Sequence, residues 1–190
     1  MFVKKLSINI LTLYEMFYKG LRRGILIFYA NTFKLLTSKH MRLQKGDSNM
    51  QFQLQFVTDE LPQTPVHINQ RTAVRGVIHY QNKILMVQTN RGDYKFPGGG
   101  MEEGETEKET LPREITAETG YTDIHIGVKI GETFEQNIDT EDPESYFQMK
   151  SCYYECWLMS DKRAPGVQDD YEEKLGFHGT FVTVEEAYQS

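Results

Sequence analysis

The stretch of sequence that decides the fold runs from Phe96 to Tyr121 and reads FPGGGMEEGETEKETLPREITAETGY. It opens with three consecutive glycines, Gly98, Gly99 and Gly100. Glycine has no side chain, so the backbone can approach a ligand closely there. The segment after the glycines has the pattern of a helix that carries several carboxylates. A glycine loop followed by such a helix is typical of a phosphate and metal site.

The helix prediction rests first on its two ends. Thr106 and Glu109 have the spacing of a capping box, and Gly120 suits the left-handed residue that follows a helix. The interval between them fits about four turns. Within it, three residues share one face: Leu111, Ile115 and Thr119.

Two glutamates, Glu114 and Glu118, lie one turn apart on a second face of this helix. Like charges at this spacing repel each other unless a positive group lies between them. Mg²⁺ suits such a place because it takes one or two protein carboxylates and bridges to substrate phosphates. The pair therefore predicts a Mg²⁺ site, with Mn²⁺ as the alternative ion. A solvated acidic helix face remains the other interpretation of two such glutamates.

The complete spacing resembles the signature of the Nudix hydrolases. Its defined positions are Gly99, then Glu105, then Arg113-Glu114-Ile115, and finally Ala117-Glu118 and Gly120-Tyr121. All of them but one match the family pattern. The resemblance implies an α/β (α+β) fold, a Nudix-like α/β/α sandwich with a mixed β-sheet. It also implies hydrolysis of a nucleoside diphosphate linked to another group.

The same resemblance implies roles for individual residues. Arg113, Glu114 and Glu118 are the expected catalytic residues, and the two glutamates are the expected metal ligands. Glu105 is the expected supporting carboxylate, since the arginine of this family pairs with a carboxylate of the signature to hold the loop. The substrate is expected at the loop itself, at Phe96, Gly98, Gly99 and Gly100.

Two residues depart from the family pattern. Ala117 stands where the family has a glutamate, so one expected metal ligand is missing. Pro112 falls inside the predicted helix, where it removes a hydrogen bond and costs about 3 kcal/mol unless the helix bends or begins later. A proline also disfavours helical geometry at the preceding residue, so Leu111 is expected to become extended.

Composition and charge limit the class of protein. The chain has 190 residues, of which 39% are hydrophobic and 25% charged, as in an ordinary soluble domain. Residues 1–50 carry a net charge of +7 and residues 51–190 carry −13. The acidic remainder argues against nucleic acid as a partner. Two cysteines four residues apart in a predicted strand are too distant for a disulfide, which favours a cytoplasmic location.

The sequence suggests three segments. Residues 1–50 form a basic, apolar extension, 51–70 a connecting segment and 71–190 the Nudix domain. The uncharged runs of the extension are too short to span a membrane. Peripheral contact with an anionic membrane is an open alternative for residues 1–50. The last segment ends soon after its final predicted strand, so the domain is expected to be shortened at its C-terminus, and a homodimer is an open alternative.

Several strands are predicted around the signature: 52–56, 73–80, 84–88, 123–131, 147–159 and 177–184. The turn Gln81-Asn82-Lys83 predicts a hairpin. The polar stretch 136–145 is expected to be a loop beside the substrate. The acidic cluster from Asp169 to Glu173 is either a further source of a metal ligand or base, on a loop, or solvated surface.

Three functional hypotheses remain from these observations. The first is a Mg²⁺-dependent diphosphohydrolase, in which a carboxylate accepts the proton of the attacking water. The second is a nucleotide-binding module, a pseudoenzyme that keeps the fold and has lost turnover through Ala117, Pro112 and the short C-terminus. The third is a membrane-peripheral protein that uses residues 1–50 as an anchor, and it is compatible with either of the others. The sequence contains no pattern that identifies the base or the sugar of a substrate.

Overall fold

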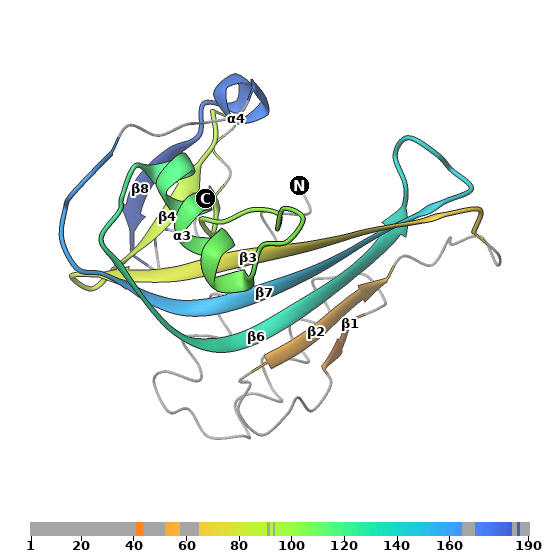
Figure 1. Ribbon diagram of the computed structural model, residues 1–190, viewed down its shortest axis with the longest axis horizontal. Helices are drawn as coiled ribbons and strands as arrows, with labels where there is room; N and C mark the ends of the chain where they lie inside the picture. Colours follow the sequence, from red (N-terminus) through yellow and green to blue (C-terminus); the bar gives the residue numbers. More distant parts are fainter. Residues whose placement is uncertain are drawn as a thin grey trace. The chain divides into compact units, whose positions relative to one another are not determined.

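The computed structural model describes residues 41–43, 52–57, 65–90, 92, 94–164, 170–183 and 186. These residues belong to two compact units. The first unit contains the described residues of 73–129 and 152–190, and the second contains those of 12–72 and 130–151. Three long strands belong in part to each unit: β3 (Ile68–Tyr80), β6 (Ile124–Ile138) and β7 (Tyr146–Leu158) (Figure 1).

In the first unit, β3 and β4 (Lys83–Gln88) form the predicted hairpin, with Tyr80 opposite Lys83. The φ angles of Gln81 and Asn82 are 47° and 63°, which a two-residue hairpin turn of this hand requires. The short strand β5 (Tyr94–Lys95) and the last strand β8 (His178–Val182) both pair antiparallel with β4. The strand order in this unit is β6-β7-β3-β4-β5, with β8 on β4.

In the second unit, β1 (Met41–Leu43) pairs antiparallel with β2 (Phe52–Val57), and β2 pairs parallel with β6. The order is β1-β2-β6-β7-β3. The sheet is therefore mixed, and the predicted strand at 52–56 is confirmed. The prediction of a loop from Gln136 is wrong at its start, because β6 continues to Ile138 and Gln136 pairs with Val57. Backbone pairing with β2 continues as far as Gln136, although Glu132, Glu135 and Gln136 have polar side chains.

The signature helix, α3 (Glu107–Thr119), has the predicted ends. The Glu109 carboxylate accepts hydrogen bonds from the Thr106 backbone N–H at 2.9 Å and from its hydroxyl at 2.7 Å, in a capping box. Gly120 follows the helix with φ 77°, in the left-handed region.

Pro112 lies inside α3, and the helix begins before it, at Glu107. The expectation that Leu111 becomes extended is therefore wrong. The reason is burial: Leu111 and Ile115 are both fully buried. Burying side chains of this size contributes about 1.5–3 kcal/mol each, which offsets a proline cost of about 3 kcal/mol. Glu114 and Glu118 follow the proline, on the intact part of the helix.

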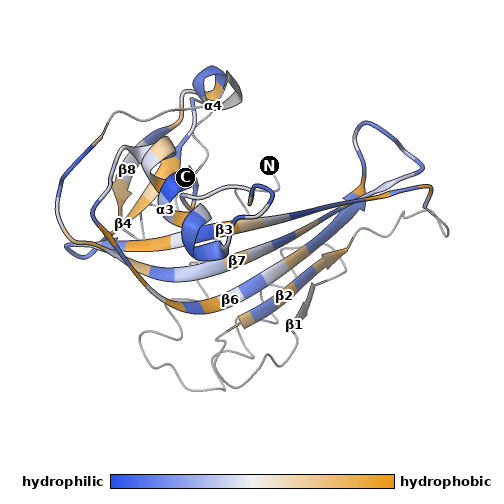
Figure 2. Cartoon of the chain, in the orientation of Figure 1, coloured by the Kyte–Doolittle hydropathy of each residue, from blue (hydrophilic) through white to orange (hydrophobic). Residues whose placement is uncertain are grey.

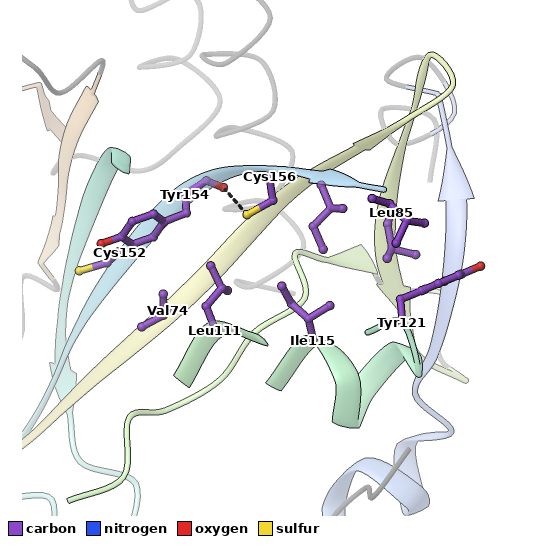
Figure 3. Packing of buried hydrophobic residues seen from close by; sticks show 10 residues of the cluster. Val74, Leu85, Leu111, Ile115, Tyr121, Cys152, Tyr154 and Cys156 are labelled. Atoms are coloured by element: carbon purple, nitrogen blue, oxygen red, sulfur yellow. Dashed lines mark hydrogen bonds between the residues drawn. The ribbon is translucent and has the colours of Figure 1, made fainter. Parts of the chain in front are cut away.

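The apolar face of α3 packs against the sheet of the first unit (Figure 3). Leu111 and Ile115 belong to one buried cluster, whose other members are Val74, Ile78, Leu85, Tyr121, Cys152, Tyr154, Cys156 and Leu158. Figure 2 shows β4 as largely hydrophobic, which agrees with four consecutive buried residues in that strand. Cys152 and Cys156 are free thiols, as the sequence predicted.

The acidic cluster near residue 170 lies on a helix, α4 (Asp170–Leu175), so the expectation of a loop there is wrong for the described residues. Asp169, residues 1–40 and residues 44–51 lie outside the part of the chain that the structure describes, and so do the predictions made for them. No helix among the described residues is long and apolar enough to cross a membrane. The α+β class with a mixed sheet is confirmed.

Candidate active site

The glycine turn that precedes α3 is held against strand β3. The Val74 N–H donates to the Gly99 carbonyl at 2.9 Å, and the Gly76 N–H donates to the Pro97 carbonyl at 2.8 Å. The Arg75 guanidinium donates to the Gly98 carbonyl. Gly98 has φ 134°, and a Cβ atom on it would lie 2.0 Å from the Val74 carbonyl oxygen. Only glycine therefore allows the turn to lie this close to the strand.

Gly99 makes room for the first of the helix glutamates. A Cβ atom on Gly99 would lie 2.2 Å from Glu114 Oε2 and 2.4 Å from its carboxyl carbon. The Glu114 carboxylate thus rests directly on the backbone of the turn. Its side chain is 14% exposed, so it remains accessible to solvent.

Glu118 lies deeper, with its side chain only 1% exposed. Its Oε2 accepts a hydrogen bond from the Gly98 N–H at 2.8 Å, and its Oε1 contacts Lys95 Nζ at 2.5 Å. Both helix glutamates therefore meet the glycine turn, Glu114 at Gly99 and Glu118 at Gly98. The sequence predicted that the two carboxylates share one face, and the structure shows which backbone that face contacts.

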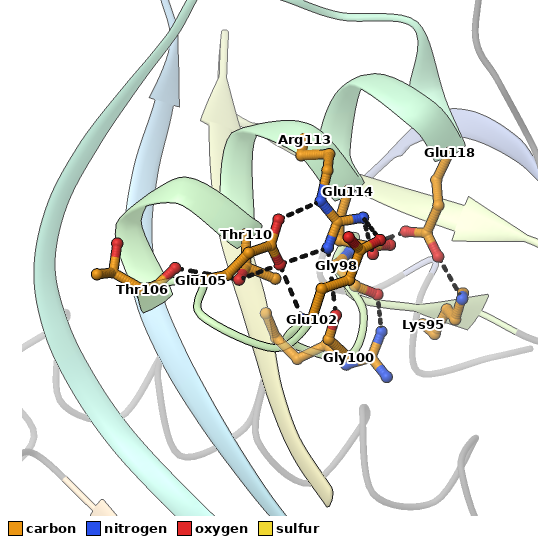
Figure 4. Close-up of polar contacts among 11 residues, drawn as sticks. Lys95, Gly98, Gly100, Glu102, Glu105, Thr106, Thr110, Arg113, Glu114 and Glu118 are labelled. Carbon is orange, nitrogen blue, oxygen red and sulfur yellow. Dashed lines mark hydrogen bonds and ion pairs between the residues drawn. The ribbon is translucent and has the colours of Figure 1, made fainter.

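Arg113 connects the helix to the loop before it (Figure 4). Its Nε and Nη2 donate to the two oxygens of Glu105 at 2.6 and 2.7 Å, a bidentate pair. Its Nη1 donates to Glu114 Oε1 at 2.6 Å. Glu105 also accepts hydrogen bonds from the Glu102 N–H and the Thr110 hydroxyl, both at 2.9 Å. One guanidinium thus fixes the loop carboxylate and orients a candidate metal ligand.

These hydrogen bonds, with the one from Arg113 largest, lower the pKa of Glu105 from 4.5 to about 2. A carboxyl group whose pKa is lower in the folded protein stabilises the fold above its unfolded pKa. That stabilisation is complete above about pH 4.5 and is lost as the pH falls towards 2.

We therefore expect Glu105→Gln to lower the melting temperature by a constant amount near neutral pH, and by less as the pH falls below about 4.5. Thermal unfolding of both proteins between about pH 7 and pH 2.5 measures this difference. An equal difference at both ends of the range would mean that the Glu105 charge contributes nothing.

A second polar network attaches the first turn of α3 to the sheet. Glu107 accepts hydrogen bonds from the Tyr154 hydroxyl at 2.6 Å and from Lys129 Nζ at 3.0 Å, and Cys152 Sγ lies 3.4 Å away. Burial raises the pKa of Glu107, but these partners outweigh it and the net pKa is lowered. This network fixes the start of the helix, and hence the position of the glutamates further along it.

Two carboxylates on a glycine turn fit Mg²⁺, which takes one or two protein carboxylates and completes its shell with water and substrate phosphates. Glu114 and Glu118 would hold the ion. Among the described residues, no group of three or more His, Cys, Asp or Glu side chains is arranged to hold a metal. Only two carboxylates are available for the ion because Ala117 contributes no oxygen at the position where the family pattern has a glutamate.

The other predicted site residues have structural positions. Phe96 is 2% exposed and packs edge to face against Tyr153, so it attaches the loop to the core. Gly100 pairs with Ala73 of β3 in an isolated bridge, and its carbonyl accepts a hydrogen bond from Arg113 Nη2 at 3.3 Å.

Two cations at the site, Lys95 and Arg75, were not predicted from the sequence. Lys95 precedes the Phe-Pro-Gly segment directly, and in a short strand this places its side chain on the opposite side from Phe96. That alternation was the available signal for Lys95. Arg75 carried no comparable signal within its strand.

The chain matches the NUDIX domain family over residues 69–189, and it belongs to that family. A relative of known activity is the ADP-ribose pyrophosphatase of Methanocaldococcus jannaschii, which is 37% identical over 65 residues. That alignment covers 32% of this chain and 38% of the relative, so the chain spans well under half of that protein.

Two solved structures are also similar. An ADP-ribose pyrophosphatase from Streptococcus suis is 22% identical, with a TM-score of 0.39, over 50% of this chain and 66% of that one. A NUDIX hydrolase from Nitrosomonas europaea is 19% identical, with a TM-score of 0.44, over 64% and 77%. The family assignment therefore rests on the domain match.

Proposed function

We propose that this protein hydrolyses the diphosphate bond of a nucleoside diphosphate linked to another group, with Mg²⁺ held by Glu114 and Glu118. The observation that carries the proposal is the contact of both carboxylates with one glycine turn, Glu118 at the Gly98 N–H and Glu114 against Gly99. Membership of the NUDIX family and the similarity to an ADP-ribose pyrophosphatase support this class of substrate.

The protein's own groups have distinct tasks in this reaction. A divalent ion supplies neutralisation of the diphosphate charge and a more acidic water. Arg113 holds Glu114 in place through its hydrogen bond of 2.6 Å and holds the loop through Glu105. Glu114 is partly exposed and lies against the turn, so it can accept the proton of the attacking water. Glu118 is buried and remains a ligand.

A nucleotide-binding module without turnover is the second candidate. Ala117 favours it, because the family pattern has a carboxylate at this position. Both oxygens of Glu118 are also engaged by protein groups, one by Gly98 and one by Lys95. The two functions differ in one observable: the hydrolase releases product, whereas the module binds nucleotide unchanged.

A substrate screen tests the proposal. Nucleotide sugars, ADP-ribose, dinucleoside polyphosphates and oxidised nucleoside triphosphates are incubated with the full chain in Mg²⁺ and in EDTA, and released nucleotide and phosphate are measured. Release of nucleotide or phosphate in Mg²⁺ but not in EDTA supports the hydrolase. Binding of nucleotide without release from any compound supports the module.

Ala117→Glu is expected to tighten metal binding, since it places a third carboxylate beside Glu118 and one turn from Glu114. Without metal, the added charge repels its neighbours by a few tenths of a kcal/mol and lowers the melting temperature slightly. With saturating Mg²⁺, the melting temperature should rise above that of the wild type. The sign change is measured by thermal unfolding in EDTA and in Mg²⁺. A decrease under both conditions would mean that no ion is held at this face.

A further inference from the structure

Lys95 has the closest contact with Glu118 among the described side chains. Its Nζ lies 2.5 Å from Glu118 Oε1, and the side chains of the pair are 18% and 1% exposed. The same Nζ lies 3.9 Å from the centre of the Phe177 ring, a cation–π contact. The aromatic ring and the carboxylate together hold the ammonium group at one point, as Figure 4 shows for the carboxylate.

A carboxylate as buried as Glu118 requires a positive partner, because water no longer solvates its charge. A divalent ion bound to Glu118 and the Lys95 ammonium would be alternative partners for the same oxygen, Oε1. The other oxygen, Oε2, is already hydrogen-bonded to the Gly98 N–H. A divalent ion and Lys95 would therefore compete for one carboxylate oxygen.

Each helix glutamate has a cationic side chain beside it without a divalent ion. Glu114 shares the Arg113 guanidinium with Glu105, whereas Glu118 is paired with Lys95. A glutamate at position 117 would add a carboxylate next to Glu118 and would favour binding of a divalent ion. With Ala117, the Lys95 ammonium is the positive group that contacts Glu118.

We propose that Lys95 is the resident counter-cation of Glu118, that it must leave Oε1 when a divalent ion binds, and that it thereby sets the metal affinity of the site. This inference deepens the proposed function, since it concerns one of the same carboxylates. Lys95 acts as a positioning residue through Glu118. The metal affinity of the wild-type protein is lowered by this competition, in addition to the loss of the ligand at Ala117.

The test uses Mn²⁺ alone, without substrate, and follows free Mn²⁺ by electron paramagnetic resonance during a titration. Lys95→Met keeps the length of the side chain and its packing on Phe177 but removes the charge. An opposite charge changes the proton affinity of a neighbouring carboxylate by about 10-fold or more. We expect the dissociation constant of Mn²⁺ to fall by at least about 10-fold in this variant. An unchanged or weaker affinity would overturn the proposal.

Three further variants serve as controls. Lys95→Arg keeps the charge and should restore an affinity close to that of the wild type. Lys150→Met removes an ion pair away from the site, since Lys150 Nζ lies 2.9 Å from Glu132 Oε1, and should leave the affinity unchanged. The double variant Lys95→Met with Glu118→Gln should lose the increase in Mn²⁺ affinity that Lys95→Met alone produces. A gain that persists in the double variant would place the metal elsewhere and contradict the proposal.

A measurement on the wild-type chain covers the case in which Lys95→Met does not fold. Lysine reactivity toward acetic anhydride is compared with and without saturating Mn²⁺, by mass spectrometry. Displacement from Glu118 should raise the labelling of Lys95 several-fold and leave that of Lys129 unchanged. Equal labelling of Lys95 in both conditions would overturn the proposal. Neither measurement uses turnover, so a failed substrate screen and a failed competition test are separate results.

Discussion

Glu118→Gln is expected to lower the rate of hydrolysis by at least about 100-fold, since removing one group that stabilises transition-state charge typically costs 10²–10³ in rate. Glutamine has the same shape and can still accept the hydrogen bond from the Gly98 N–H, which lies 2.8 Å from Oε2 in the wild type. What it lacks is the charge that holds a divalent ion. The effect should therefore appear in turnover at saturating substrate.

The matched control is Glu103→Gln, at an exposed residue of the loop before the same helix. It removes the same charge from the same segment, and its rate should stay within about two-fold of the wild type. Circular dichroism and thermal unfolding of both variants separate a loss of catalysis from a loss of fold. Equal rates for Glu118→Gln and the wild type would exclude Glu118 from the reaction.

Gly98→Ala is expected to destabilise the protein by about 3 kcal/mol or more. The new Cβ would lie 2.0 Å from the Val74 carbonyl oxygen, which is backbone of the central strand β3 and cannot move aside alone. The φ of 134° adds strain for any residue with a side chain. At about 2–4 °C per kcal/mol for a protein of this size, the melting temperature should fall by about 6–12 °C.

Gly104→Ala separates the two causes of that loss. Gly104 also has a positive φ, 85°, but a Cβ atom there would meet nothing within 4 Å. Only backbone strain of about 1 kcal/mol should appear. Similar decreases in melting temperature for the two variants would mean that the close approach of the turn to β3 contributes little to stability.

The signature helix could be predicted from sequence because its determinants are local. The capping residues Thr106 and Glu109 lie three positions apart, and Gly120 closes the helix at its other end. The buried face at Leu111 and Ile115 follows from helical spacing alone. The same local rules gave the wrong result at Pro112, because the burial that offsets its cost is a property of the packed sheet.

The cations of the site could not be predicted, because their partners are distant in sequence. Lys95 and Glu118 are 23 residues apart, as are Arg75 and Gly98. Their contacts arise only after β3 and β5 are placed beside α3. The length of β6 could not be predicted for the same reason. Its pairing partner, β2, is distant in sequence, and no local pattern connects the two segments.

The central claim is that this chain cleaves a diphosphate bond by attack of water, with Mg²⁺ at Glu114 and Glu118. The most direct test is to run the reaction found in the screen in ¹⁸O-labelled water, in Mg²⁺ and in EDTA, and to locate the label by mass spectrometry. A diphosphohydrolase must place one labelled oxygen on the phosphate of one of the two products, in Mg²⁺ only. Label on a carbon-bound oxygen, or nucleotide that binds and is recovered unchanged, would contradict the claim.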